Sequence, residues 1–181
     1  ALPASRFAVR SSAAGEDSSE ASFAGQHVTK LNVRREDLAA AGRAVWEPAY
    51  ADAARLYRHH RGLPSEPRIG AVVQILVEPL AAGVMFTRNP VTGADEHVIE
   101  ASWGLGEIVV SGMVTPDRFR MDRNGALVEI TPGQKDVKLG YGDDGGTFDV
   151  RVPDDLHALP CLRTPHLEGL VTLAQRCREI W

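Results

Sequence analysis

Cysteine is scarce in this sequence, which holds only Cys161 and Cys177. Two cysteines with no CxxC pair and no paired histidines exclude a disulfide framework and give no zinc-binding pattern, so we expect reduced structural thiols. The chain has 17 glycines, 11 prolines and 6% aromatic residues among its 181 positions. This composition excludes collagen-like and low-complexity proteins and is ordinary for a globular domain.

The chain also lacks a strong excess of charge and a long apolar run. Lys and Arg number 20 against 24 Asp and Glu, a net charge of −4 without blocks of one sign. The electrostatic field of a chain with this charge does not suit a protein that neutralises nucleic-acid phosphates. No stretch approaches the roughly 20 apolar residues of a membrane helix, and the first ten residues lack a signal-peptide layout. We therefore expect a cytoplasmic protein that binds neither nucleic acid nor membrane.

The first third of the chain combines strand, loop and helix signals. Residues 6–10 (RFAVR) predict a short strand, which leads into residues 11–26, a segment of Ser, Ala, Gly and acidic residues. A strand that feeds a loop of small residues is typical of phosphate-binding loops. From residue 35 to residue 60 the apolar residues recur at helical spacing, and Pro48 predicts a kinked helix or a helical hairpin.

The rest of the chain is rich in strand signals. Three apolar runs predict strands buried on both faces: 69–77, 81–88 and 97–102. Alternating segments with NG, PG and GG between them predict a β-meander over 118–122, 126–130, 135–141 and 147–152. Helical periodicity returns in residues 166–181. The pattern as a whole predicts an α+β protein with mixed and antiparallel sheets, a helical insertion and a C-terminal helix.

The segment VRSSAAGEDSSEASFAGQ is the first candidate for chemistry. The Arg10 guanidinium can bind two phosphate oxygens, and small side chains let backbone N–H groups approach an anion. Those small residues are Ser11, Ser12, Ser22, Ala24 and Gly25. The alternative is a surface loop with Arg10 in an exposed ion pair, which the acidic residues of the segment favour.

Three further segments permit a functional and a structural interpretation. The connector QILVEP (74–79) between apolar strands offers the apolar slot and backbone edge that an adenine ring needs, or it is a buried hairpin. Glu107, framed by glycines, can accept hydrogen bonds from a ribose or hold a magnesium-bound water, or it caps a helix dipole. Lys135 and Lys138 either reach a phosphate or are solvated lysines on an edge strand.

Together, VRSSAAGEDSSEASFAGQ, QILVEPLAAGVMFTRNPVTG and VIEASWGLGEIVVSGMVTPDRF resemble the ATP-binding domain of the phosphoenolpyruvate synthase, pyruvate phosphate dikinase and rifampin phosphotransferase family. The resemblance covers about residues 6–140. It implies an ATP-grasp fold, in which two α+β subdomains hold ATP. It also implies that ATP, with Mg2+, phosphorylates a histidine on a separate domain, which passes the group to pyruvate or an antibiotic. The partners would be the phosphohistidine and pyruvate-binding domains of the parent protein.

The resemblance also assigns residues. The arginine of the family's VRSSA motif, which contacts ATP phosphates and so takes part in catalysis, corresponds to Arg10. Ser11, beside Arg10, is a further nucleotide-binding residue, and the loop over the phosphates corresponds to residues 22–26, with Ser22, Ala24, Gly25 and Gln26. The adenine-binding connector corresponds to Gln74, Val77 and Glu78. The glutamate of the GLGE motif corresponds to Glu107. No residue is assigned to metal, because the family's main metal-binding carboxylate belongs to a later D-x-E-W segment.

The sequence departs from the family at both ends. It has neither the ATP-binding lysine segment that opens the family's domain nor the D-x-E-W and Q-x-R-P segments that close it. We therefore expect the larger part of an ATP-grasp domain, inactive in catalysis alone, with residues 1–68 carrying the phosphate loop and helical subdomain and residues 69–181 the strand-rich subdomain. The alternatives are a stand-alone, catalytically incomplete nucleotide-binding or regulatory module, and part of an antibiotic-inactivating phosphotransferase.

Overall fold

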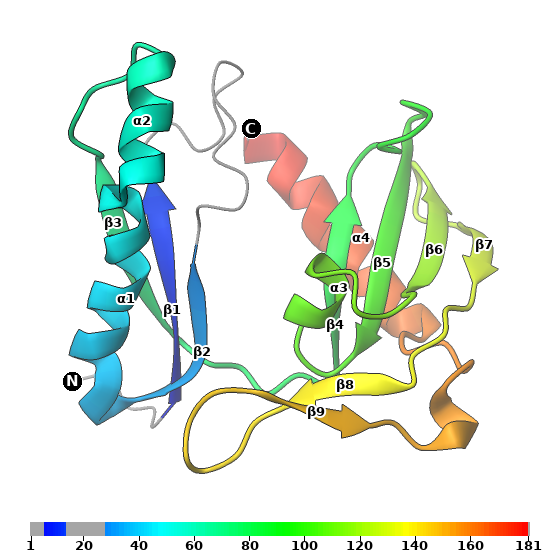
Figure 1. Ribbon diagram of the computed structural model, residues 1–181. Coiled ribbons are helices and arrows are strands. Elements are labelled where there is room, and N and C mark those ends of the chain that lie inside the picture. Colours follow the sequence, from blue (N-terminus) through cyan, green and yellow to red (C-terminus); the bar gives the residue numbers. More distant parts are fainter. Residues whose placement is uncertain (1–5, 14–27, 181) are drawn as a thin grey trace. The chain divides into compact units, whose positions relative to one another are not determined.

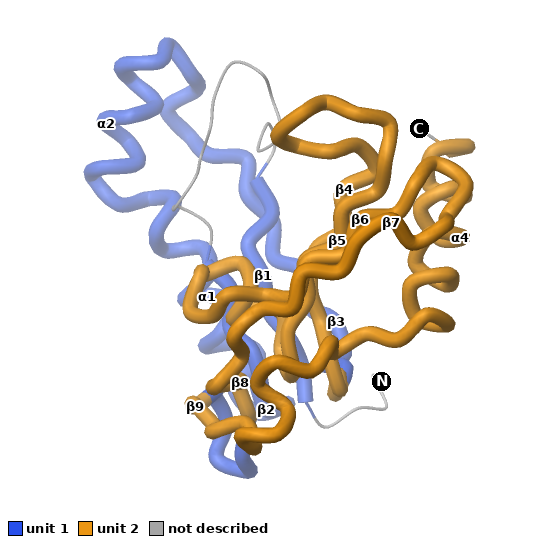
Figure 2. Tube along the Cα trace, turned by 90° about the vertical axis from the view of Figure 1, so that its right-hand side faces the viewer, with its two compact units in different colours: residues 1–77, 141–147 blue, residues 78–140, 148–181 orange. Residues whose placement is uncertain are grey.

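The computed structural model describes residues 6–13 and 28–180. The chain divides into two compact units, which are shown in two colours in Figure 2. Unit 1 comprises residues 1–77 and 141–147, and unit 2 comprises residues 78–140 and 148–181. Helices accompany antiparallel sheets in the described part, so the predicted α+β class is confirmed, although every described strand ladder is antiparallel where we also expected mixed sheets.

Unit 1 is a three-stranded sheet of order β2-β1-β3 with helix α1 on one face (Figure 1). Its elements are β1 (Arg6–Ala13), β2 (Thr29–Arg34), a 3-10 turn (Arg35–Asp37), α1 (Leu38–Tyr50), α2 (Asp52–His60) and β3 (Ile69–Ile75). Phe7 and Val9 of the central strand are wholly buried against Ala41 and Val45 of α1. The strand predicted at the start and the interrupted helix are both confirmed.

The break between α1 and α2 follows from Pro48. Proline has no N–H to donate, and the helix ends two residues later at Tyr50, where Ala51 is extended (ψ 151°). Nη1 of the buried Arg58, on α2, donates to the Ala49 carbonyl at 2.7 Å and so occupies an acceptor that the helix end leaves open. A cation at the end of α1 also suits the helix dipole.

Asn32 holds a distant segment within unit 1. It has a positive φ of 54° where the β1–β2 register shifts, and its side chain is completely buried. Asn tolerates this left-handed conformation better than most residues, as a β-bulge requires. Its Nδ2 donates to the carbonyls of Gly142 (2.9 Å) and Gly146 (2.8 Å). Residues 141–147 therefore belong to unit 1, although they connect two strands of unit 2.

Unit 2 is a four-stranded sheet of order β4-β5-β6-β7 with α4 on one face and the short α3 on the other (Figure 1), accompanied by a two-stranded sheet. Its elements are β4 (Ala81–Phe86), β5 (Glu96–Trp103), α3 (Glu107–Val110), β6 (Asp117–Asp122), β7 (Leu127–Thr131), β8 (Val137–Gly140), β9 (Phe148–Arg151), a 3-10 turn (Asp154–Leu156) and α4 (Thr164–Ile180). Ile99, Phe119 and Met121 of the sheet pack against Leu167 and Val171 of α4. None of the described helices is long and apolar enough to cross a bilayer.

Two expectations about the strands are wrong. β3 is not buried on both faces: Val72, Val73 and Ile75 are 40 to 45% exposed, because β3 is an edge strand of an antiparallel sheet. The four segments after residue 117 do not form one meander either. β6 and β7 continue the larger sheet, whereas β8 and β9 pair only with each other.

A buried carboxylate organises the loops of unit 2. Asp117, at the start of β6, has no exposed surface, and its Oδ1 accepts hydrogen bonds from the Gly133 amide (2.8 Å) and the Lys135 ammonium (2.5 Å). Its Oδ2 accepts the Cys161 amide at 2.7 Å. Lys135 is also completely buried, so the edge-strand interpretation is wrong for this lysine. Burial, together with the neighbouring Asp117 carboxylate, raises the pKa of the Cys161 thiol to about 12, so the thiol stays protonated.

The buried Asp117–Lys135 pair predicts a large loss on mutation. Lys135→Met leaves an uncompensated buried carboxylate, which costs about 3 to 5 kcal/mol. The control is Arg123→Met, which removes a cation that lies 3.9 Å from Asp95 and is 71% exposed. Urea unfolding should therefore show a large decrease in the free energy of unfolding for the first variant and a small one for the second. Equal decreases would show that the buried pair does not organise unit 2.

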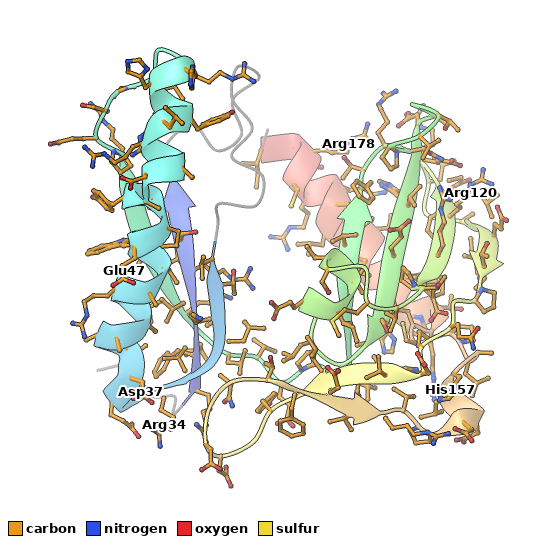
Figure 3. All side chains as sticks on the ribbon, viewed as in Figure 1. Arg34, Asp37, Glu47, Arg120, His157 and Arg178 are labelled. Carbon is orange, nitrogen blue, oxygen red and sulfur yellow. The ribbon has the colours of Figure 1, made fainter. Side chains whose placement is uncertain are left out.

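His97 predicts a pH-dependent stability. Its ring nitrogens are buried and have no hydrogen-bond partner among residues 6–13 and 28–180. Burial, followed by the charge of Arg178 from the end of α4 (Figure 3), lowers the pKa of His97 below 6.5. The unfolded chain therefore binds more protons than the folded chain just below pH 6.5, so stability falls as the pH falls through this range. The carboxyl pKa values of Glu96 and Asp122 are lowered too, but from starting values below 5, so they act at lower pH.

We expect the Tm of the protein to decrease between pH 7 and pH 5, and His97→Leu to flatten this decrease. Thermal unfolding by circular dichroism across that range measures both slopes. If the variant keeps the slope of the parent protein, His97 is not the group that titrates.

Candidate functional site

Unit 1 presents Arg10 on the sheet face opposite α1. Side chains alternate along a strand, so Phe7 and Val9 face α1 and Arg10 belongs to the opposite face, where it is exposed. Its cross-strand neighbour on β3 is Val72, and Gln74 stands opposite Ala8, two positions further along the same face. Arg10 forms no ion pair or hydrogen bond among the described residues. The structure thus brings two of the predicted ligands, Arg10 and Gln74, to one sheet face and leaves the guanidinium of Arg10 available to an anion.

Ser11 forms two hydrogen bonds that link the end of β1 to Val28, the residue that precedes β2. Its amide donates to the Val28 carbonyl at 3.1 Å, and its Oγ accepts the Val28 amide at 3.1 Å. This contact engages the groups that an anion would need, so a ligand role for Ser11 stays a prediction. The other predicted loop residues lie outside the described residues: Ser22, Ala24, Gly25 and Gln26.

The predicted adenine connector coincides with the boundary between the two units. Unit 1 ends at Val77, which is 70% exposed, and unit 2 begins at Glu78, which is also exposed. Both follow the end of β3 and belong to no helix or strand. The two compact units divide after Val77, because β3 pairs with β1 of unit 1. The boundary between ATP-grasp subdomains that we expected after residue 68 remains a prediction.

Unit 2 presents Glu107 at the end of a tight turn. Gly104 has a φ of +77°, and its amide donates to the Leu80 carbonyl at 3.0 Å, which turns the chain at the end of β5. Gly106 lies so close to β4 that an added Cβ would be 3.4 Å from the Ala82 side chain. Glu107 follows as the first residue of α3, as predicted, and its side chain is exposed. The turn therefore presents an exposed carboxylate on the sheet face opposite α4.

The turn also contacts β8, the strand that carries Lys138. A Cβ added to Gly104 would lie 3.0 Å from the Leu139 carbonyl and 3.2 Å from Cβ of Lys138. β8 therefore passes directly beside the turn, and Lys138 is half-buried there. The sequence analysis gave Lys135 and Lys138 the same interpretation, because nothing in the neighbouring residues indicates that only Lys135 pairs with a buried aspartate.

A polar groove of about 370 Å3 lies elsewhere on unit 2, and none of the predicted site residues lines it. One of its lining residues is Arg120 (Figure 3), which forms ion pairs with Glu96 (2.9 Å) and Glu129 (2.6 Å). Hydrogen bonds from Arg120 and then from Asn89 lower the pKa of the Glu96 carboxyl. Because the Arg120 cation is paired with the Glu96 and Glu129 carboxylates, we interpret the polar residues of this groove as a structural network.

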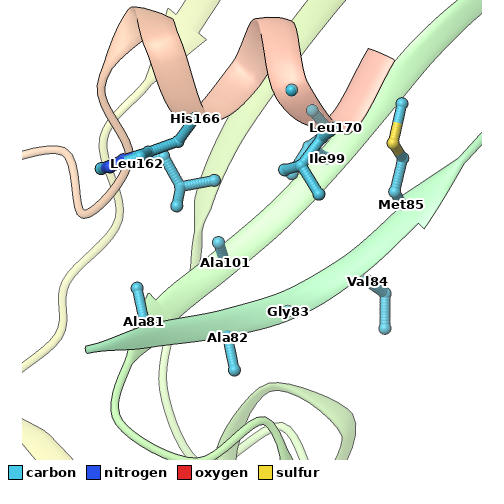
Figure 4. A pocket seen from close by; sticks show the side chains of 11 residues that line it. Ala81, Ala82, Gly83, Val84, Met85, Ile99, Ala101, Leu162, His166 and Leu170 are labelled. Carbon is cyan, nitrogen blue, oxygen red and sulfur yellow. The ribbon is translucent and has the colours of Figure 1, made fainter. Parts of the chain in front are cut away.

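An apolar cleft of about 340 Å3 separates β4 from α4 (Figure 4). Ala81, Ala82 and Gly83 line it from the sheet, and His166 and Leu170 line it from the helix. It also contains none of the predicted site residues. Its apolar lining offers little to a polyphosphate, so the candidate site remains the Arg10 face of unit 1 and the Gly104–Glu107 turn of unit 2.

Among the described residues, no three His, Cys, Asp or Glu side chains come together as metal ligands. Glu107 alone supplies an exposed carboxylate oxygen at the turn. In nucleotide sites a magnesium ion is usually held by one or two carboxylates together with several waters and the substrate phosphates. The described residues therefore do not form a metal site by themselves.

The sequence matches the pyruvate phosphate dikinase AMP/ATP-binding domain over residues 2–181. A probable phosphoenolpyruvate synthase of Methanothermobacter thermautotrophicus is 42% identical over 175 residues, which cover 95% of this chain and 25% of that protein. The prodigiosin synthesizing transferase PigC of Serratia marcescens is 38% identical, over 97% of this chain and 20% of that protein. A rifampicin phosphotransferase of a Streptomyces species is 37% identical, over 95% of this chain and 20% of that protein. The chain thus spans a quarter or less of the length of these relatives.

We expect alanine substitutions at two glycines with similar φ angles to lower the free energy of unfolding by different amounts. Gly104 (φ +77°) lies against β8, whereas Gly112 (φ +70°) has no atom within 4 Å of an added Cβ. An alanine in the left-handed region costs about 1 to 2 kcal/mol at either position. Gly104→Ala must also displace β8, so urea unfolding should show a larger loss for Gly104→Ala than for Gly112→Ala. Equal losses would contradict the close approach of the turn to β8.

Proposed function

The chain belongs to the pyruvate phosphate dikinase AMP/ATP-binding domain family, and from this premise we propose that it is the ATP-binding part of a phosphotransferase with an ATP-grasp fold. In the proposed reaction, a phosphoryl group of ATP passes to a histidine on a separate domain and from there to pyruvate or another acceptor. The described residues contribute ATP binding and orientation. The histidine nucleophile and the acceptor site belong to other domains of the parent protein.

The availability of Arg10 is the observation that carries the proposal. Phosphoryl transfer needs little covalent chemistry from the protein, because catalysis consists of positioning and of neutralising charge on the transferred group. A guanidinium offers a planar pair of donors that suits two phosphate oxygens. Arg10 is exposed on a rigid central strand and unpaired among the described residues, so its charge is not already compensated. Gln74 on the same face adds a polar side chain beside it.

The remaining predicted residues receive complementary roles in this proposal. The extended connector at Val77 and Glu78 supplies backbone donors and acceptors to the edge of the adenine ring, as an ordered but irregular segment can. Glu107 accepts a ribose hydroxyl or orients a water on the metal. We propose that magnesium arrives bound to the ATP phosphates and meets its main protein carboxylate outside the residues described, where the family's D-x-E-W segment would supply it. The magnesium ion would offset the negative charge of the phosphates.

The final acceptor stays open in this proposal. Relatives of similar identity carry the names phosphoenolpyruvate synthase, prodigiosin synthesizing transferase and rifampicin phosphotransferase. Proteins with such different names share this segment, which supports a role in the common use of ATP rather than in acceptor recognition. A cytoplasmic location, where ATP is abundant, is part of the same proposal.

Calorimetric titration with Mg-ATP tests the proposed function. The protein should bind saturably, and Arg10→Ala should weaken binding, because a charge-assisted hydrogen bond contributes about 1.5 to 3 kcal/mol. Arg43→Ala is the matched control, since Arg43 is an exposed arginine on α1, the helix that covers the other face of the sheet. Absence of binding by the parent protein, or equal affinities for the two variants, would contradict the proposal.

A further inference from the structure

The contact between Gly104 and β8 places one lysine beside the Gly104–Glu107 turn. An added Cβ at Gly104 would be 3.2 Å from Cβ and 3.5 Å from Cδ of Lys138, so the aliphatic stem of Lys138 lies along the glycine. Gly104 has no side chain and a left-handed backbone, which is what permits this approach. Long cationic side chains commonly pack their stems on such surfaces and keep the charged end in water.

The charge of Lys138 is uncompensated in the described part of the chain. The sequence has only three lysines, Lys30, Lys135 and Lys138. Lys135 is buried and paired with Asp117, so it offers no charge to a ligand. Lys138 is half-buried and forms no ion pair with any described residue. Of Lys135 and Lys138, the two lysines that the sequence offered as phosphate ligands, Lys138 is therefore the one that can meet an anion.

We propose that Lys138 is a nucleotide-binding residue that contacts the polyphosphate at the Gly104–Glu107 turn. The inference rests on the proposed function and adds a cation on unit 2 to the predicted nucleotide ligands. A lysine ammonium is a flexible point charge with three donors, suited to a phosphate chain whose oxygens are distributed along it. Glu107 on the turn would repel the same phosphates, and the ammonium of Lys138 offsets that repulsion.

The binding test uses Lys138→Met, which retains most of the stem on Gly104 and removes the charge. We expect its Kd for Mg-ATP in calorimetry to rise about tenfold, the size of one charge-assisted contact, and its Kd for adenosine to change less than about twofold. The control is Arg151→Gln, which removes a positive charge from the same hairpin. Arg151 pairs with Val137 in the register, so it lies on the hairpin face opposite Lys138.

Amine acetylation gives a second measurement that does not depend on a variant. Lys138 should react in the ligand-free protein, and Mg-ATP or tripolyphosphate should protect it, whereas adenosine should not. Lys135 is completely buried, so its modification would report unfolding. Mass spectrometry of the peptide around residue 138 measures the extent of reaction.

The outcomes separate the two claims. If the parent protein binds Mg-ATP but Lys138→Met keeps its affinity and acetylation of Lys138 is unaffected by ATP, the inference is wrong and the proposed function stands. If the parent protein binds no nucleotide, the proposed function fails and the inference fails with it. Weaker binding of both ATP and adenosine by Lys138→Met would assign the residue a structural role at the turn and also overturn the inference.

Discussion

The hydrogen bonds of the Asp117 carboxylate determine much of unit 2. This single buried side chain accepts the Gly133 amide, the Lys135 ammonium and the Cys161 amide, and so joins three segments of the chain: its own, residues 133–135 and residue 161. A buried carboxylate is costly unless its lone pairs are satisfied, so these segments are held in one arrangement. Two of them lead directly into β8 and α4. The position of β8 beside the Gly104–Glu107 turn, and therefore the position of Lys138, follows from this constraint.

The two units present different chemistry for the proposed use of ATP. Unit 1 places Arg10 and Gln74 on a sheet face whose other side is fixed by the packing of Phe7 and Val9 on α1. Unit 2 places Glu107 and Lys138 around a turn that glycines make possible. Of these predicted ligands, Arg10, Gln74 and Glu107 are exposed and Lys138 is half-buried, whereas neighbours such as Phe7, Val9 and Ile108 are buried. Rigid supports of this kind reduce the ordering cost of ligand binding.

Local sequence patterns predicted much of the fold. The strand-like run RFAVR predicted β1, and Pro48 predicted the break between α1 and α2. The interpretation of Glu107 as the cap of a helix predicted the start of α3. These features depend on neighbouring residues, so a local pattern contains the necessary information. The identification of Arg10 and Glu107 as ligands depended instead on the resemblance to a family and remains a prediction.

The features that the sequence did not predict depend on distant residues. Lys135 looks like a surface lysine until Asp117, 18 positions earlier, is known to lie beside it. The apolar character of β3 suggested burial on both faces, but only the pairing order shows that β3 is an edge strand. Residues 141–147 look like a simple hairpin connection, yet the amide of Asn32, more than 100 positions away, holds them in unit 1. Contacts of this kind are set by tertiary structure, which the local periodicity of a sequence does not predict.

Mapping of Mg-ATP binding by backbone amide chemical shifts tests the central claim most directly. The account predicts saturable shift changes in both units, at Arg10 and its β3 neighbours in unit 1 and at the Gly104–Glu107 turn and Lys138 in unit 2. The residues that line the cleft between β4 and α4 should be much less affected. Shift changes confined to that cleft, or no change at saturating Mg-ATP, would contradict the account.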